Sequence, residues 1–133
     1  NSPGIKLIEL LASMEMEGRM FARLGALFER YRLLICPTIA LPSVAAAFDP
    51  SKDRLRINGK RVDSFFGLYM TWPFNMMSRC PVMSVPSGFA KSGVPTGLQI
   101  VGRAYDDVAV FRAAAAFERL RPLYDKPERR PKL

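Results

Sequence analysis

The sequence predicts a single α/β unit in which helices flank a β-sheet, and three observations support this fold class. Apolar residues recur at steps of three and four over the first 31 positions, as in an amphipathic helix. The apolar run Leu33–Cys36 and the later segments 82–85 and 96–101 have the length and composition of strands. A second helical pattern follows Asp106 and contains four consecutive alanines. Strands between two helical segments are typical of an α/β domain.

The first helix is expected to begin at Ser2-Pro3, because serine can cap free amides and proline fits the first turn. Gly18 and Gly25 weaken the middle of this helix, so a break near Gly18 is one alternative. Its apolar stripe consists of Leu7, Leu11, Met14, Phe21, Leu24, Phe28 and Tyr31.

The next segments are a strand and a long loop. Leu33–Cys36 is an uninterrupted apolar run that ends at Pro37, which predicts a strand buried on both faces. From there to about residue 62 the composition changes to proline, alanine and charged residues. Asn58-Gly59 is a strong turn signal, so we expect a small hairpin over residues 55–62.

Two short helices should follow the loop. The Asp63 side chain can cap a helix over residues 65–69, and Pro73 limits how far that helix continues. A further short helix is expected over residues 75–79.

A β-hairpin and a final helix complete the unit. The strands 82–85 and 96–101 are joined by turn-forming residues. In the second strand, alternation should place the Leu98 and Ile100 side chains on one face and those of Gln99 and Val101 on the other. The last helix is expected to begin at Asp106-Asp107 and stop at Pro122, with Val110, Phe111, Ala114 and Phe117 as its apolar face.

The composition is that of an ordinary globular protein. About half of the 133 residues are apolar and a quarter are charged, which is enough for a real core. The longest apolar runs are far shorter than the roughly 20 residues of a membrane span, and no secretory signal pattern opens the sequence. We therefore expect a cytoplasmic protein without a membrane partner.

Basic residues are concentrated in two places. Residues 52–61 hold five basic residues and one acidic residue, and residues 119–132 hold six and two, which together account for the net charge of +8. One interpretation is that these two basic segments attract phosphates or an acidic partner. The favoured interpretation is that they are a loop and a tail whose charges are simply solvated. Nucleic acid is not an expected partner, because the tail offers chiefly prolines and Tyr124 between its charges. Residues 120–133 are expected to form a partly disordered basic tail.

The chain contains no histidine, which excludes Ser-His and Cys-His pairs and histidine-based metal sites. No cofactor and no metal is expected. Cys36 and Cys80 lie far apart, and free buried thiols are favoured over a disulfide between them. Ser84, Ser87 or Ser92 could pair with Lys91 only if that lysine were desolvated, and a turn would leave it protonated. The sequence therefore predicts no catalytic residue.

Three ordered segments resemble the closing part of amidase-signature hydrolases. They are LFERYRLLICPT over residues 27–38, TWPFN and CPVMSVPSGFAKSGVPTGLQIVGR within residues 71–103, and DDVAVFRAAAAFE over residues 106–118. Members of that family cleave amides with a lysine, a bridging serine and a nucleophilic serine, and both serines lie in a Gly/Ser-rich stretch. No such stretch occurs in this sequence.

The resemblance implies that residues 1–133 are the C-terminal portion of an amidase domain, with a mixed β-sheet flanked by helices. Such a portion would supply scaffold and pocket wall, and would be inactive alone. Its implied partners are the N-terminal amidase portion, or further copies that associate through exposed sheet edges, and the parent enzyme would bind a small amide. The alternative is a non-catalytic interaction or oligomerisation module derived from an amidase.

The resemblance also suggests three residues that line the substrate pocket: Phe65, Leu68 and Trp72. In the glutamine-using branch of the family, an aspartate that binds the substrate's amino group stands three residues before the motif's threonine. Leu68 holds that position here and cannot pair with an ammonium group. An amidase for apolar or aromatic amides is therefore favoured over a glutaminase component for transfer-RNA amidation.

Overall fold

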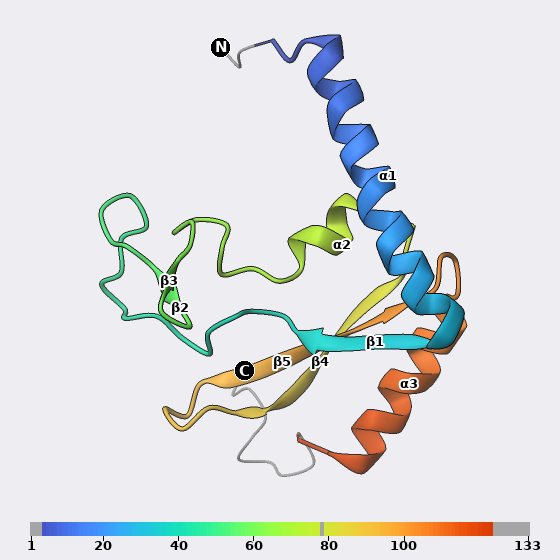
Figure 1. Ribbon diagram of the computed structural model, residues 1–133. Coiled ribbons are helices and arrows are strands. Elements are labelled where there is room, and N and C mark those ends of the chain that lie inside the picture. The colour runs from blue at the N-terminus through green and yellow to red at the C-terminus, as the bar shows by residue number, and fades with distance from the viewer. Residues whose placement is uncertain (1–3, 78, 124–133) are drawn as a thin grey trace.

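The structure is a computed structural model that describes residues 4–77 and 79–123, and it confirms the predicted α/β class (Figure 1). Within these residues the elements are α1 (Leu7–Arg30), β1 (Leu33–Pro37), β2 (Arg56–Ile57), β3 (Lys60–Arg61), α2 (Trp72–Met76), β4 (Val82–Phe89), β5 (Pro95–Gly102) and α3 (Asp107–Leu120). Ser2, Pro3 and most of the predicted tail lie outside the described residues. Residues 4–6 are described and are not helical, so the first helix begins later than the start expected at Ser2-Pro3.

The main sheet of the described chain has the strand order β1-β5-β4, and both of its ladders are antiparallel. Ile100 in β5 lies opposite Ile35 on one side and Met83 on the other. A mixed sheet therefore stays a prediction for the whole family fold. The β4–β5 hairpin has the predicted position, with longer strands and a bulge between Pro86 and Gly88.

The two faces of the sheet carry separate cores. Ile100 packs with α3, whereas its neighbour Val101 packs with the C-terminal half of α1. This is the alternation that the sequence predicted for β5. The first core consists of Val85, Ile100, Val110 and Ala114, and the second of Leu24, Phe28, Met77, Cys80 and Val101.

Helix α1 is unbroken through Gly18, so the alternative of a break there is wrong. The Lys6 N–H donates to Glu9 Oε2 at 2.9 Å and closes the first turn, which makes Leu7 the first helical residue. Figure 1 shows the N-terminal half of this helix extending away from the sheet. The side chains of Leu7 and Leu11 are accordingly exposed.

Strand β1 differs from its prediction of burial on both faces. It is an edge strand of the described sheet, and the Ile35 side chain is 58% exposed. The reason is that β1 pairs with β5 alone, and Ile35 is not part of the core that α3 forms over Ile100.

The other local signals give mixed outcomes. Asn58 and Gly59 have φ angles of 50° and 76° and form the predicted hairpin turn between β2 and β3. Asp106 caps α3 as expected, because its Oδ1 accepts the Ala109 N–H at 3.2 Å. However, Phe111 of that helix is exposed, and the short helix predicted over 75–79 begins earlier, at Trp72.

Candidate functional site

The three residues proposed from sequence belong to one stretch, residues 63–72, which we call the wall segment. It opens with a tight turn, because Asp63 Oδ1 accepts the N–H groups of Phe65 at 2.9 Å and Phe66 at 2.7 Å. The predicted cap is therefore confirmed, but the predicted helix over 65–69 is wrong. The backbone makes a single turn here and does not continue as a helix. This turn requires glycine at position 67, because a Cβ there would lie only 2.6 Å from the Asp63 carbonyl oxygen.

Aromatic rings cover the outside of the wall segment. The Phe66 and Trp72 rings meet edge to face with centroids 5.2 Å apart, a favourable geometry for aromatic pairs. The Phe65 ring lies 6.4 Å from that of Phe66. All three side chains are exposed, with Phe65 at 53% and Trp72 at 45%. The segment thus presents an apolar surface to solvent.

The structure places Phe65 and Trp72 on the aromatic surface beside Phe66, whereas Leu68 is half-buried, and the hollow that Phe65 lines includes neither Leu68 nor Trp72. Phe65 lines a polar hollow beside Arg54 and Arg61. Leu68 is half-buried, and its carbonyl accepts the Ala40 N–H at 2.9 Å. Trp72 is the first residue of α2. A pocket-lining role for these residues stays a prediction, and sequence reasoning did not single out Phe66, the ring between two of them.

Backbone hydrogen bonds tie the wall segment to the end of β1. Ile39 and Tyr69 form an isolated antiparallel bridge, in which the Met70 N–H donates to the Thr38 carbonyl at 3.0 Å. The Thr38 hydroxyl in turn donates to the Gly97 carbonyl of β5 at 3.2 Å. The wall segment is therefore positioned by the sheet.

A single buried side chain, Gln99, completes this attachment. Its Nε2 donates to the Pro37 carbonyl at 3.0 Å and to the Met70 carbonyl at 2.9 Å, so it joins β1 to the wall segment. The residue is 0% exposed. Its Oε1 has no hydrogen-bond partner among the described residues, which is uncommon for a buried polar atom. A lone polar residue in the apolar stretch GLQIVG was the sequence signal for such a role.

The candidate nucleophiles are not activated in the described chain. Ser87 Oγ shares a hydrogen bond with the Thr96 hydroxyl at 2.9 Å, and Lys91 lies exposed in a turn. Burial raises the pKa of the Cys36 thiol, partly offset by the Gln99 side chain, and burial also raises the pKa of Cys80. Both cysteines are free, as predicted, but only Cys80 is buried and Cys36 is half-buried; both thiols stay protonated near neutral pH.

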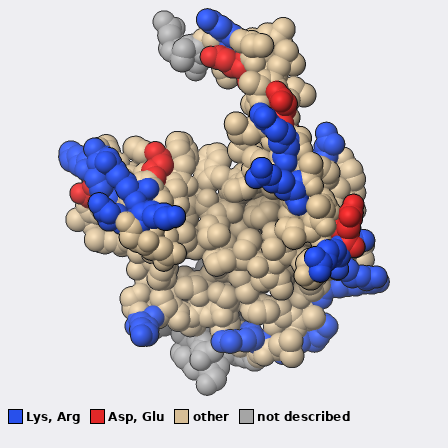
Figure 2. All heavy atoms as spheres, viewed as in Figure 1, with Lys and Arg blue, Asp and Glu red and all other residues tan. Residues whose placement is uncertain are grey.

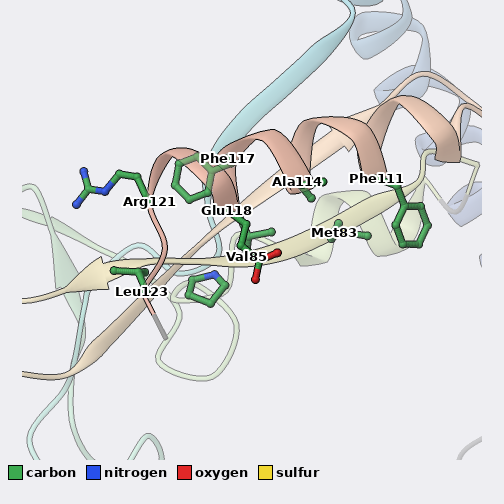
Figure 3. Close-up of a pocket in the computed structure, with 10 residues that line it drawn as sticks. Met83, Val85, Phe111, Ala114, Phe117, Glu118, Arg121 and Leu123 are labelled. Atoms are coloured by element: carbon green, nitrogen blue, oxygen red, sulfur yellow. The ribbon is translucent and has the colours of Figure 1, made fainter. Parts of the chain in front are cut away.

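A separate apolar cavity of about 280 Å³ lies between α3 and β4. Figure 3 shows Phe111 at one end of it and Arg121 and Leu123 at the other. This cavity lies on the face of the sheet that is covered by α3, whereas the Gln99 side chain points to the opposite face. Among the described residues that line it there is no serine, cysteine or lysine, so it holds no nucleophile.

Residues 4–77 and 79–123 contain neither a membrane-spanning helix nor a metal-binding cluster. No helix in these ranges has the length and hydropathy needed to cross a bilayer. No group of three or more Cys, Asp or Glu side chains in these ranges could hold a metal ion.

A family model described as Amidase matches residues 5–111. The chain belongs to the amidase family. The resemblance of the three segments to amidase-signature hydrolases is thereby confirmed. The superposition that follows confirms the α/β fold of this family, and only the mixed character of the sheet stays a prediction. A crystal structure of a bacterial aryl acylamidase of the amidase-signature family superposes with a TM-score of 0.77 at 34% identity. The superposed region covers 96% of this chain and 26% of the aryl acylamidase chain.

Two of the curated relatives carry different names. The chain is 38% identical over 109 residues to the A component of a glutamyl-tRNA(Gln) amidotransferase from Brevibacillus brevis, a match that covers 78% of this chain and 20% of the relative. It is also 38% identical over 98 residues to an acylamidase of Rhodococcus erythropolis, covering 72% and 20%. The chain thus spans about a fifth of the length of these relatives.

Proposed function

We propose that this chain is the C-terminal scaffold of an amidase that cleaves a carbon–nitrogen amide bond through a serine acyl-enzyme. The attachment of the wall segment to the sheet through Gln99 carries this proposal, together with the match to one region of much longer amidases. The scaffold holds an apolar surface in a fixed place and leaves the covalent chemistry to residues of other parts of the enzyme.

The chain alone should be inactive. Acyl transfer to serine needs a nucleophile in contact with a base and donors that stabilise the oxyanion. In the described residues no serine or cysteine contacts a lysine through a hydrogen bond, and the cysteines have raised pKa values. The sequence offers no Gly/Ser-rich stretch that could supply the missing pair.

The proposed substrate class is an amide with an uncharged apolar or aromatic acyl group. By its resemblance to the family, Leu68 takes the position at which the glutamine-using branch would bind an ammonium group, and the Phe66 and Trp72 rings of the same segment form apolar surface. Each methylene that such a surface buries contributes about 0.8 kcal/mol. The overall identities do not separate acylamidase from amidotransferase, so Leu68 is the feature that favours the acylamidase type.

A complementation assay tests this function. We expect the purified chain alone to release no 4-nitroaniline from 4-nitroacetanilide. Mixed with the portion of the aryl acylamidase that precedes the matched region, it should restore hydrolysis. The restored rate should be lost when the nucleophilic serine of that portion is replaced by alanine, since the chain itself supplies no nucleophile.

Two outcomes would contradict the proposal. Hydrolysis by the chain alone, at a rate that Lys91→Ala does not change, would reveal an active site of its own. Restored activity that prefers glutamine to 4-nitroacetanilide would contradict the substrate class.

The alternative is an interaction module, and the N-terminal half of α1 favours it. Leu7, Leu11 and Met14 continue the same stripe that Leu24 and Phe28 bury against the sheet, yet all three are exposed. An unpartnered apolar stripe of this length favours association with another surface. In the amidase proposal that surface is the rest of the enzyme, and in the alternative it is a second copy.

Light scattering coupled to size exclusion distinguishes the two. Under the module hypothesis we expect a dimer that Leu11→Lys converts to a monomer, because a charge enters the stripe. Met16→Lys is the matched control: it is also an exposed apolar side chain, and five residues are about 1.4 helical turns, which places it on another side of α1. A concentration-independent monomer, or equal effects of both substitutions, would count against the module.

A further inference from the structure

A basic surface covers the β2–β3 hairpin, away from the wall segment's attachment to the sheet. Figure 2 shows Lys and Arg side chains gathered over this part of the molecule. The sequence of residues 52–61 accounts for them with five basic residues against one acidic residue. A local excess of this size attracts anions.

The surface is hollowed at one place. A polar hollow of about 440 Å³ is lined by the guanidinium-bearing residues Arg54 and Arg61 and by Asp63, Ser64 and Phe65. Both arginine residues are exposed, and in the described part of the chain neither comes within 4.0 Å of a carboxylate. The two guanidinium groups therefore keep their donors available for a ligand.

Two carboxylates near the hollow, and one oxygen of a third, already have partners. Asp49 accepts the Ser51 hydroxyl at 2.6 Å and pairs with Lys52 at 3.1 Å, and these contacts, those of Ser51 first, lower its pKa. Asp53 accepts the Asp49 N–H at 2.7 Å. Asp63, which lines the hollow itself, uses Oδ1 to cap the turn of the wall segment. The carboxylate oxygens in these contacts therefore face backbone amides, the Ser51 hydroxyl and Lys52.

The backbone on both sides of the hollow is cross-linked. The Ser64 hydroxyl donates to the Asp53 carbonyl at 2.8 Å and accepts the Leu55 N–H at 3.3 Å. The Val62 N–H donates to the Leu55 carbonyl at 3.1 Å. Because these bonds converge on the buried Leu55, the backbone segments that carry Arg54 and Arg61 are held relative to one another before any ligand arrives.

We propose that this hollow binds a phosphate monoester that carries an aromatic group. Two guanidinium groups match the two charges of a monoester dianion and offer paired N–H donors to its oxygens. A carboxylate carries one negative charge and would balance only one of the two positive charges. The exposed Phe65 ring lines the same hollow and offers an apolar surface to the aromatic group. This site does not depend on amide hydrolysis.

Calorimetric titration of the full chain with phenyl phosphate at low salt tests the site. We expect saturable binding of one ligand, weakened about tenfold by Arg54→Gln and by Arg61→Gln, since each substitution removes a charge-assisted hydrogen bond. Phe65→Ala should weaken phenyl phosphate several-fold and leave inorganic phosphate unchanged. Because all three side chains are exposed, these variants should keep the wild-type circular dichroism spectrum.

Lys91→Gln is the matched control, since it removes one exposed positive charge at the β4–β5 turn, outside the hollow. It should leave binding unchanged. Binding that does not saturate, or an equal loss in Lys91→Gln and Arg54→Gln, would show diffuse attraction and overturn the site. Tighter binding of benzoate than of phenyl phosphate would overturn the ligand class.

Discussion

Replacing Gln99 with methionine should lower the free energy of unfolding by about 2–4 kcal/mol. Methionine has nearly the same length, so the change removes the amide while leaving little empty volume. The carbonyls of Pro37 and Met70 would then lose the Nε2 donor that both use, and because these hydrogen bonds are part-buried, each loss should cost an amount toward the lower end of about 1–3 kcal/mol. The loss of Oε1 should cost nothing in the described chain, because that atom has no partner there.

Urea denaturation followed by circular dichroism measures this loss. Ser84→Ala is the matched control, since it removes an exposed hydroxyl from the neighbouring strand and should change stability by less than about 0.5 kcal/mol. Hydrogen exchange adds a local readout. The Ala40 amide bonds to Leu68 and the Met70 amide bonds to Thr38, so both connect the wall segment to the chain after β1, and both should exchange faster in the methionine variant. Equal stability of the two variants would contradict the role given to Gln99.

Gly102→Ala should destabilise the protein by about 1–3 kcal/mol, the usual cost of overpacking a core. A Cβ at this position would lie 2.5 Å from Val110 Cγ2 and 3.2 Å from the Asp106 carbonyl oxygen. Val110 is buried, and Asp106 is held in place by its cap on α3, so neither can move away freely. The methyl group would therefore push the helix off the end of β5.

Gly25→Ala in α1 is the opposite case. Apart from its chain neighbours and the backbone of α1 itself, nothing lies within 4 Å of a Cβ built at Gly25, and alanine is the better helix former by about 0.5–1 kcal/mol. Thermal or urea unfolding of the two variants should thus shift in opposite directions. Shifts of the same sign would show that chain entropy, rather than the contact with α3, decides the effect at Gly102.

The elements that sequence predicted well are those with local causes. Helix α3 follows from a capping aspartate and a run of alanines, and the β2–β3 turn follows from Asn58-Gly59, so nothing distant is needed to form either. The alternation of side chains in β5 is equally local.

The features that sequence missed depend on distant contacts. Residues 65–69 have no helix because Tyr69 bridges to Ile39, some thirty positions earlier. The attachment through Gln99 joins β5 to β1 and to the wall segment, and neither partner can be identified from spacing. The exposure of Ile35 likewise depends on which surfaces cover β1. For the proposed site, the sequence located the wall segment. It did not identify the Phe66 ring, nor Gln99 as the side chain that attaches the segment to the sheet.

The edge-to-face pair of Phe66 and Trp72 gives this protein a natural optical reporter. Trp72 is the only tryptophan in the 133 residues, so its fluorescence comes from a single position on the aromatic surface. Its indole is 45% exposed, and any molecule that settles there replaces water around it. Emission would then move to shorter wavelength, and occupancy of the surface could be followed without a label.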